Sequence, residues 1–350
     1  MKIRESIEAI KAQTHLTRLE ARGVMKLLLS GSVPDEEIVA LLTALRDKGE
    51  KAEELVGFAE EMRTHATETL GAAGVDVASI SDQEPLLDTC GTGGDGRGTF
   101  NVSTAAALVA AAGGVRVAKH GNRSISSHCG SADVLEALGV AIDLPLEPIP
   151  ACLEEVGMVF LFAPRLHLAM KHVTNARRSL KTKSVFNLLG PLTNPLAATI
   201  QLVGVFDPGR TEMMAETLRS VGTRRAYVVT GSDGIDEITT TGPTRLSATN
   251  GAGVQTRDVF PEEFRLPRAT IEQLHGGDAE TNARLLLRVL EGHRSPYRDV
   301  VLANAAAAFT LAGKCHDFAE GVEVAAEALD SGAARAKLQA LVEFTQRHRR

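Results

Sequence analysis

The chain has 350 residues, 44% of them hydrophobic and 23% charged, which is enough for two domains of ordinary composition. A formal net charge of −6, no tryptophan and two tyrosines argue against a general nucleic-acid binder. No apolar run approaches the roughly 20 residues that a membrane-spanning helix needs. The four cysteines lie far apart without a C-x-x-C pair, and the start has no signal-peptide core. We therefore expect a cytoplasmic protein without zinc or disulfides.

Roughly the first 70 residues predict only helices. Thr17 and Glu20 form a capping-box pattern, which opens a helix that ends near Gly31. Pro34, with the acidic residues Asp35 and Glu36 directly after it, marks the start of a second helix. A third helix is expected over residues 51–68. Nothing in this part predicts a strand.

From Leu86 onward, short apolar runs alternate with glycine turns and helical segments, which is typical of an α/β domain. The expected core strands are residues 115–117, 140–142, 158–162, 202–206 and 226–229. Helices are expected around Ala105, Val134, Ala215 and Leu287, one further helix over residues 164–180, and mostly helix in the C-terminal third.

A glycine-rich segment with the sequence DTCGTGGDG spans residues 88–96, after a predicted strand. Glycines let the backbone approach a ligand closely and turn its amide groups toward an anion. Residues 101–104 (NVST) then open a predicted helix, whose N-terminus adds positive partial charge. The combination predicts a phosphate-binding cradle. Taken alone, the segment is also compatible with a simple turn and an ordinary helix cap, and it does not match the P-loop pattern.

A second polar segment, KHGNRSISS, spans residues 119–127 after another predicted strand. Two cations, an imidazole, an amide and three hydroxyl groups in one loop suit a bound polyanion. A polar surface loop is the alternative interpretation. Ser131 or Asp133 is then placed to cap the next helix.

Two further features are weak signals by themselves. Asp236 and Glu237 follow Gly234 and offer the hard oxygen ligands that Mg²⁺ prefers, although an isolated acidic turn is more often simply solvated. Arg177 alone would be an exposed charge on a helix, although its planar guanidinium suits a carboxylate.

Taken together, these segments resemble those of the anthranilate phosphoribosyltransferases, in order and spacing across nearly the whole chain. The matching segments are residues 88–95, 101–104, 119–139, 162–164, 170–173, 177–178, 186–195 and 234–237. The resemblance implies a transferase that joins anthranilate to 5-phosphoribosyl 1-pyrophosphate (PRPP). The products would be N-(5-phosphoribosyl)anthranilate and pyrophosphate, in the second step of tryptophan biosynthesis from chorismate.

The resemblance also implies residue roles. PRPP would be bound by Gly91, Gly94, Asp95, Thr99, Asn101, Val102, Ser103, Thr104, Lys119, His120, Gly121, Asn122, Arg123, Ser124, Ile125, Ser126, Ser127 and Ser131. Anthranilate would contact Gly91, His120, Asn122 and Arg177. Two Mg²⁺ ions would accompany bound PRPP, with Ser103, Asp236 and Glu237 as metal-binding residues. Lys119, Asp95 and Glu237 would act electrostatically, and no acid, base or nucleophile is identified.

The architecture that the resemblance implies is α/β, similar to the nucleoside phosphorylases and phosphoribosyltransferases. A small discontinuous helical domain (residues 1–75 with 164–189) would join a large α/β domain with a central mixed sheet (residues 76–163 with 190–350). A homodimer joined through the helical domain is implied, with small-molecule substrates and no nucleic-acid or membrane partner. Leu168, Asn175 and residues 181–184 depart from the family pattern, which often has two prolines and a glycine-containing turn ending in Arg-Thr.

Two other functions are compatible with parts of this pattern. A pyrimidine nucleoside phosphorylase shares the fold, but its phosphate loop differs from residues 119–127. A non-catalytic paralogue that binds nucleic acid should lose Lys119, Asn122, Arg177 or the 236–237 pair and gain basic patches, whereas this acidic chain keeps all of them. Consumption of anthranilate fluorescence on addition of PRPP and Mg²⁺ would discriminate among the three.

Overall fold

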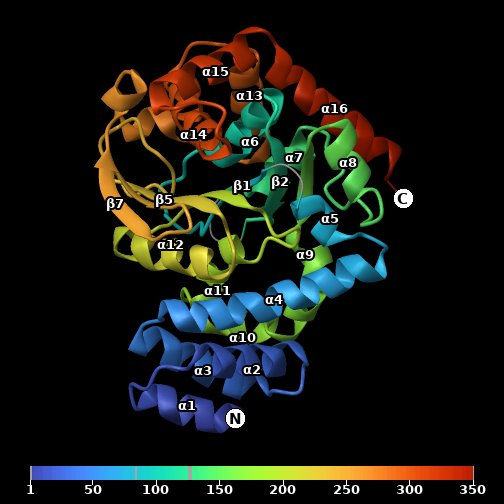
Figure 1. Ribbon diagram of the computed structural model, residues 1–350, viewed down its shortest axis with the longest axis vertical. Helices are drawn as coiled ribbons and strands as arrows, with labels where there is room; N and C mark the ends of the chain where they lie inside the picture. Colours follow the sequence, from blue (N-terminus) through green and yellow to red (C-terminus); the bar gives the residue numbers. More distant parts are fainter. Residues whose placement is uncertain (1, 83–84, 125–127, 350) are drawn as a thin grey trace.

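The computed structural model describes residues 2–82, 85–124 and 128–349. A group of helices lies at one end of the molecule and an α/β part with a seven-stranded sheet at the other (Figure 1). The N-terminus is at the tip of the helical end, and the C-terminus lies beside the α/β part (Figure 1). None of the described helices is both long and apolar enough to cross a membrane.

The helical end contains α1 (Ile3–Lys11), α2 (Arg18–Leu29), α3 (Asp35–Lys48), α4 (Ala52–Ala72), α10 (Thr174–Leu180) and α11 (Val185–Leu189). The strands are β1 (Leu86–Gly91), β2 (Arg116–Gly121), β3 (Met158–Phe162), β4 (Ile200–Gly204), β5 (Arg225–Gly231), β6 (Thr244–Thr249) and β7 (Val254–Val259). The other α-helices are α5 (Val77–Ser81), α6 (Val102–Ala112), α7 (Ser131–Ala137), α8 (Ile149–Glu155), α9 (Ala163–Leu166), α12 (Thr211–Ser220), α13 (Ala279–Leu290), α14 (Pro296–Ala312), α15 (Phe318–Asp330) and α16 (Ala333–Arg347). Short 3₁₀ helices include η1 (Leu168–His172), η2 (Gly190–Leu192) and η3 (Pro208–Arg210).

The sheet has the strand order β3-β2-β1-β4-β5-β6-β7. The first five strands run parallel, and β6 and β7 run antiparallel to their neighbours. The predicted mixed sheet is therefore confirmed. The chain builds outward from β1 to β3 on one side and then from β4 to β7 on the other. In open α/β sheets, ligands bind outside the carboxyl ends of the strands where the strand order reverses, which here is at β1 and β4.

The two faces of the sheet pack against different layers. Side chains alternate between faces along a strand, so Leu202 of β4 belongs to the large core beneath α6 and α14, whereas Val203 packs with the core of the helical end. Helix α12 contributes Met214 and Leu218 to this second core. Figure 1 shows α6 and α13 to α15 on one side of the sheet and α12 on the other. The helical end is thus packed directly against the α/β part.

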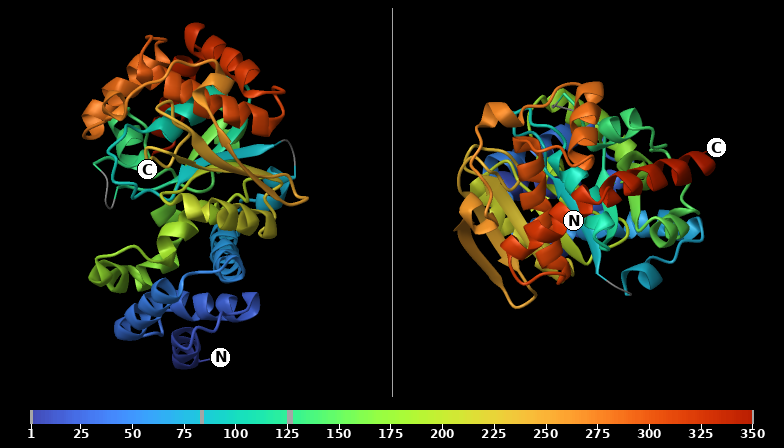
Figure 2. Two further views of the ribbon diagram at one scale, coloured as in Figure 1. Left: turned by 90° about the vertical axis from the view of Figure 1, so that its left-hand side faces the viewer. Right: turned by 90° about the horizontal axis from the view of Figure 1, so that it is seen from above.

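The helical end begins as its sequence predicts. The Thr17 and Glu20 capping box is present, because the amide of Thr17 donates to Oε2 of Glu20 across 2.9 Å and the amide of Glu20 donates to Oγ1 of Thr17 across 3.3 Å. Helix α10 packs on α3 and α11 packs on α4, and the green segment that holds α10 lies with the blue N-terminal helices in Figures 1 and 2. This packing agrees with a discontinuous helical domain, whose boundaries stay a prediction.

Two expected elements are wrong. Residues 140–142 form no strand, because the amide of Val140 bonds to the carbonyl of Leu135 at the end of α7 and the amide of Ala141 bonds to Oγ1 of Thr345. Residues 164–180 form α9, η1 and α10 rather than one helix. The backbone leaves the helical region at His167, with φ −111° and ψ 57°, and this interrupts the hydrogen-bond pattern.

Strands β6 and β7 were not expected, because their outward side chains are polar and their apolar runs are short. A signal was present, however. Asn250 and Gly251 stand between two alternating segments, and an Asn-Gly pair is a frequent hairpin connection. The other four strands expected at residues 115–117, 158–162, 202–206 and 226–229 exist, with the third shifted to Ile200–Gly204.

Candidate active site

The glycine-rich segment at the end of β1 forms one wall of the candidate site. Three of its glycines have positive φ, namely Gly93 (61°), Gly94 (74°) and Gly96 (70°), and so does Gly98 (65°) just beyond the segment. Gly91 pairs with Gly204 of β4, and a Cβ at Gly91 would stand 2.5 Å from Oδ2 of Asp236. Thr99 pairs with His275 in an isolated bridge. Glycine therefore lets the acidic turn approach the end of β1 directly.

The acidic turn faces this loop and the start of α6. The amide of Gly93 donates to Oδ2 of Asp236 across 2.9 Å, and the amide of Ser103 donates to Oε1 of Glu237 across 3.0 Å. Burial and the charge of Asp95 raise the pKa of Asp236 to about 6. Burial and the charge of Asp236 raise the pKa of Glu237 well above its usual value. Crowded, half-buried carboxylates of this kind are stabilised by a nearby cation.

Asp95 adds a third carboxylate to this end of the site. Its Oδ1 accepts a hydrogen bond from the amide of Arg97 across 3.2 Å. Its Oδ2 is buried without a hydrogen-bond partner in the part of the chain that the structure describes. Over those same residues, no group of three or more His, Cys, Asp or Glu side chains is arranged to hold a metal ion. One or two carboxylates, completed by phosphate and water, nevertheless suit Mg²⁺.

Lys119 lies at the floor of the site rather than on an extended loop. It is on β2 and only 1% exposed, and its Nζ donates to the carbonyl of Thr89 across 2.5 Å and to Oγ of Ser103 across 3.2 Å. Burial lowers the pKa of Lys119, while the charge of Asp88 acts in the opposite direction. Its ammonium therefore joins β1, β2 and the start of α6.

The second polar segment is partly a strand. Lys119, His120 and Gly121 are the last residues of β2, so the segment expected as one loop begins only at Asn122. A side chain at Gly121 would collide with the hydroxyl of Ser131. Residues Ile125, Ser126 and Ser127 lie outside the described residues.

The described part of this loop is held by α7. Oδ2 of Asp133 accepts hydrogen bonds from the amides of Ser124 and Gly130, each across 2.9 Å. The N-cap of α7 is Gly130, so neither Ser131 nor Asp133 is the N-cap, and Asp133 bonds to the N-cap amide from the third position of the helix. The guanidinium of Arg123 bonds to Glu136 across 2.7 and 3.0 Å and to Asp133 across 3.1 Å. The Ser131 hydroxyl donates to the Asn122 carbonyl across 3.4 Å. Arg123 is thus paired with protein carboxylates in this conformation.

The start of α6 is held by amide side chains. Asn101 makes no side-chain cap; its Nδ2 donates to the carbonyl of Cys129 across 3.2 Å, and its Oδ1 accepts from Asn282 across 2.9 Å. Val102 is buried in the core, and the buried hydroxyl of Thr104 has no hydrogen-bond partner among the described residues. The backbone amide of Ser103, at this end of α6, faces the acidic turn.

Three buried nitrogen atoms without hydrogen-bond partners among the described residues form a polar cluster beside β2. They are Nε2 of His120, Nε2 of His167 and Nη2 of Arg63. The two imidazole rings are 5.1 Å apart at an angle of 60°. Burial, followed by the neighbouring His167, lowers the pKa of His120 to about 3, and burial lowers that of His167 to about 4. Both rings are therefore neutral at neutral pH. His167 and Arg63 were not identified from the sequence, where they stand in no recognisable motif.

The loop over residues 190–195 is fixed to the same strands by Asp88, whose role sequence reasoning also missed. Asp88 is fully buried; its Oδ1 accepts from the amide of His120 across 3.1 Å, and its Oδ2 accepts from Asn194 across 2.9 Å. Asn194 also donates to the carbonyl of Ala118 across 2.8 Å. The signal was an Asp within an apolar strand, because a buried carboxylate needs such partners.

Arg177 of α10 is a cation without a carboxylate partner. Its guanidinium lies 4.9 Å from the centre of the Phe186 ring, and burial lowers its pKa. No hydrogen bond or ion pair to this guanidinium is found within residues 2–82, 85–124 and 128–349. Over the same ranges, no hydrogen bond, ion pair or ring contact joins the Arg177 side chain to that of His120 or Asn122. Arg178 beside it is exposed. Arg177 is thus available to an anionic ligand.

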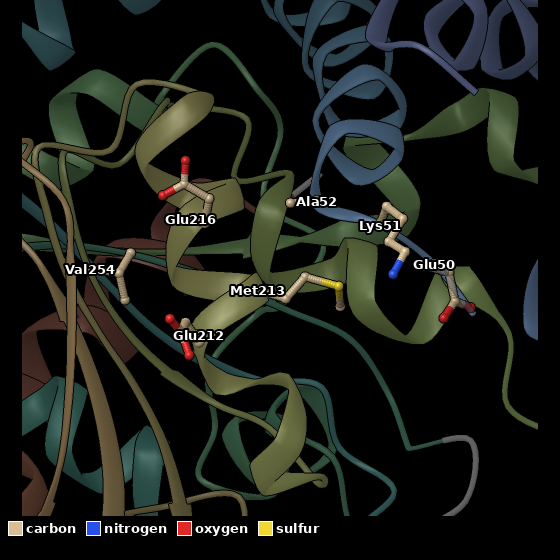
Figure 3. A pocket seen from close by; sticks show the side chains of 7 residues that line it. All are labelled: Glu50, Lys51, Ala52, Glu212, Met213, Glu216 and Val254. Carbon is tan, nitrogen blue, oxygen red and sulfur yellow. The ribbon is translucent and has the colours of Figure 1, made fainter. Parts of the chain in front are cut away.

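A separate hollow of about 520 Å³ lies where α4 meets α12, as Figure 3 shows. It is lined by Glu50, Lys51, Ala52, Glu212, Met213, Glu216 and Val254. Oε2 of Glu50 is already bonded to Arg210 across 2.8 Å. None of the predicted site residues lines this hollow.

Comparison with known proteins agrees with this geometry. The a/b domain model of the glycosyl transferase family matches residues 83–335, and the helical bundle domain model of that family matches residues 4–66. The anthranilate phosphoribosyltransferase of Moorella thermoacetica is 48% identical over 344 residues, which cover 98% of each chain. That of Solibacter usitatus is 49% identical over 332 residues, covering 95% of each. The chain belongs to the anthranilate phosphoribosyltransferase family.

Solved structures of the family share the fold. The anthranilate phosphoribosyltransferase of Thermus thermophilus is 42% identical, with a TM-score of 0.87 over 97% of this chain and 99% of that chain. The enzyme of Saccharomyces cerevisiae, in complex with PRPP and Mg, is 26% identical with a TM-score of 0.87 over 99% of this chain and 98% of its own. The same yeast enzyme has also been solved with 4-fluoroanthranilate.

Proposed function

We propose that this anthranilate phosphoribosyltransferase uses the cleft at the carboxyl ends of β1 and β2 to transfer the phosphoribosyl group of PRPP to anthranilate. The bond between ribose carbon 1 and the pyrophosphate oxygen breaks, and a bond from the anthranilate nitrogen to that carbon forms. One amine proton is released, and pyrophosphate leaves. The observation that carries the proposal is the meeting of the glycine loop, the start of α6 and the Asp236–Glu237 turn around two backbone-to-carboxylate hydrogen bonds.

The glycine loop and the start of α6 would hold the phosphates of PRPP. Backbone amides in left-handed turns and at a helix N-terminus form a concave positive surface that suits anions. Lys119 would act from beneath, by fixing Ser103 and contributing its charge. The described residues Asn122, Arg123, Ser124 and Ser131 would complete the binding surface, together with residues 125–127. For Arg123 to reach a phosphate, it must exchange its bonds with Asp133 and Glu136.

The carboxylates fit Mg²⁺. Asp95 presents a buried oxygen without a partner among the described residues, and Asp236 and Glu237 carry raised pKa values. We propose that Asp236, Glu237 and Ser103 hold two Mg²⁺ ions together with PRPP, as the complex of the yeast relative with PRPP and Mg suggests. Bound Mg²⁺ would neutralise the charge that develops on the leaving pyrophosphate.

Anthranilate would bind between Arg177 and the polar cluster beside β2. A guanidinium without a carboxylate partner offers a planar pair of donors to the anthranilate carboxylate. The neutral imidazole of His120, with Gly91 and Asn122, would line the path of the amine. Because PRPP already carries a good leaving group, orientation of the two substrates and electrostatic stabilisation supply the catalysis without a strong base.

The decisive experiment mixes the purified chain with anthranilate, PRPP and Mg²⁺. Loss of anthranilate fluorescence that depends on all three, with one pyrophosphate released per anthranilate, supports the transfer. Phosphorolysis of a pyrimidine nucleoside instead would support the phosphorylase alternative. Binding of nucleic acid without turnover would support the non-catalytic one.

We also propose that the chain is a homodimer joined through the helical end and that it works in the cytoplasm. Leu19 of α2, which is 80% exposed, gives this end an apolar surface residue. Light scattering of the eluting peak on a size-exclusion column measures the oligomeric state, and exchange of Leu19 for Glu tests whether α2 takes part.

A further inference from the structure

The turn between α10 and α11 contacts both parts of the molecule. Oγ1 of Thr182 accepts a hydrogen bond from Nη1 of Arg46 in α3 across 2.9 Å. The next residue, Lys183, places its Nζ 3.4 Å from the centre of the Phe206 ring, just beyond β4. Residues 181–184 are also where this sequence departs from the pattern of its family. The departure therefore lies at a contact between the helical end and the candidate site.

Phe206 is itself tied to the glycine loop. Its amide donates to Oγ1 of Thr92 across 3.2 Å, and the amide of Thr92 donates to the carbonyl of Gly204 across 2.9 Å. The following amide, that of Gly93, donates to Asp236. The residue whose ring lies under the ammonium of Lys183 is thus joined by one hydrogen bond to the loop that we assign to phosphate.

The charges around Lys183 are those of the acidic half of the site. Partial burial lowers the pKa of Lys183, and the carboxylates of Asp95, Asp236 and Asp207 oppose that shift. The nearby Arg210 is already paired with Glu50 across 2.8 Å and with Asp207 across 3.4 Å. Lys183 forms no ion pair within the part of the chain that the structure describes. Within the same residues, neither Asp95 nor Asp236 forms an ion pair with a basic side chain, whereas Asp207 is paired with Arg210.

We propose that Lys183 is an additional substrate-binding cation, which balances the charge of Asp95 and Asp236 in the absence of substrate and turns to the pyrophosphate of bound PRPP. The inference rests on the proposed function. A lysine suits this role because its ammonium sits on a long flexible stem, and a contact with an aromatic ring at an exposed site is weak enough to exchange.

Removal of the Lys183 charge should change the affinity for a metal ion and the affinity for PRPP in opposite directions. Without PRPP, the ammonium and a divalent cation compete for the same carboxylates, so its loss should strengthen binding of a bare metal ion. With PRPP, the ammonium attracts the pyrophosphate, so its loss should weaken PRPP binding. A residue that merely supports the fold would not produce this pair of opposite shifts.

The test compares Lys183→Met, which keeps the length and apolar stem, with Lys183→Arg and with Lys181→Met as the matched control on the same turn. Mn²⁺ binding without PRPP is measured by electron paramagnetic resonance, and PRPP binding with Mg²⁺ by calorimetry. For Lys183→Met we expect tighter Mn²⁺ binding and a PRPP affinity lower on the order of tenfold, the range of a lost charged hydrogen bond. The Michaelis constant for anthranilate should change little, and Lys183→Arg should restore PRPP affinity.

Lys183→Met that equals Lys181→Met in both titrations would overturn the inference, as would weakening of Mn²⁺ and PRPP binding together. The proposed function is tested separately by the wild-type chain. If the wild type transfers the phosphoribosyl group but Lys183→Met is indistinguishable from it, the inference alone fails. If the wild type consumes no anthranilate, the function fails, while the Mn²⁺ titration still reports on the charge of Lys183.

Discussion

The amide nitrogen of Ser103 donates a hydrogen bond to Oε1 of Glu237 across 3.0 Å, although 134 residues separate the two in the chain. This bond joins the start of α6 to the acidic turn. A carboxylate at a helix N-terminus is stabilised by the helix dipole, yet burial and Asp236 raise the pKa of Glu237. The local fold thus holds the Glu237 carboxylate where its ionised form is destabilised, and a bound cation would offset this destabilisation.

The first prediction concerns this carboxylate. Glu237→Gln keeps an oxygen that can accept the Ser103 amide but removes the charge, so the chain should remain folded and lose most of its Mg²⁺-dependent turnover. Thermal melting and initial rates over a range of Mg²⁺ concentrations are measured together. The exposed Glu280 of α13 provides the control Glu280→Gln. A wild-type rate and Mg²⁺ dependence in Glu237→Gln would remove this residue from the site.

Lys119 gives a prediction about both binding and stability. Lys119→Ala leaves the carbonyl of Thr89 and the hydroxyl of Ser103 without their buried donor. Removal of a charged hydrogen bond of this kind costs on the order of 1.5–3 kcal/mol. We expect PRPP affinity and the free energy of unfolding to fall together, measured by calorimetric titration and by urea unfolding. The exposed Lys314 serves as the control site. Unchanged PRPP affinity would contradict the role assigned to the floor of the site.

His167 gives a pH-dependent prediction. Burial lowers the pKa of His167 to about 4 from its usual 6.5, so the unfolded chain binds this proton at a higher pH than the folded chain. The stabilising contribution of the neutral ring is therefore complete above pH 6.5 and is lost as the pH falls toward 4. Between these values, one such group changes the free energy of unfolding by up to about 1.4 kcal/mol per pH unit.

His167→Gln keeps an amide donor for the carbonyl of Thr193, with which the imidazole bonds, but it has no proton to gain. Its free energy of unfolding should therefore fall less steeply between pH 6.5 and 4.5 than that of the wild type. Urea unfolding at several pH values measures the difference. The exposed His316 supplies the control His316→Gln, which should keep the wild-type slope. A variant slope equal to the wild-type slope would mean that His167 is not buried in its neutral form.

The sequence predicted the elements that local chemistry specifies. The capping box at Thr17, the glycine loop after β1 and the helical start of the chain follow from short-range patterns, and the structure contains them. Prediction from the sequence failed where residues far away in the chain determine the local structure. Residues 140–142 are as apolar as a core strand, but α16 supplies Thr345 as the partner for Ala141 from 204 positions away. No local pattern contains that information.

The same distinction applies to the site. Motifs identified the glycine loop, the Lys119 segment and the Asp236–Glu237 turn separately, whereas their contact with each other is a property of the sheet order. His167 stands in no recognisable motif, and Lys183 belongs to residues 181–184, which the sequence shows only as a departure from the family pattern. They became candidates only because folding leaves one with a buried unpaired nitrogen and the other on the ring of Phe206.

The last prediction separates the two substrates through Arg177. Arg177 lies over Phe186 without a carboxylate partner among the described residues, whereas Arg178 is exposed and points about 100° away around the helix. Arg177→Ala should raise the Michaelis constant for anthranilate many-fold and leave that for PRPP nearly unchanged, because we propose that the phosphates bind at the ends of β1 and β2. Arg177→Lys should recover only part of the loss, since an ammonium cannot make two parallel bonds to a carboxylate.

Arg178→Ala is the matched control and should behave nearly as the wild type. Steady-state kinetics of the three variants provide the measurement. Equal changes in both Michaelis constants, or greater damage at Arg178, would show that anthranilate binds elsewhere.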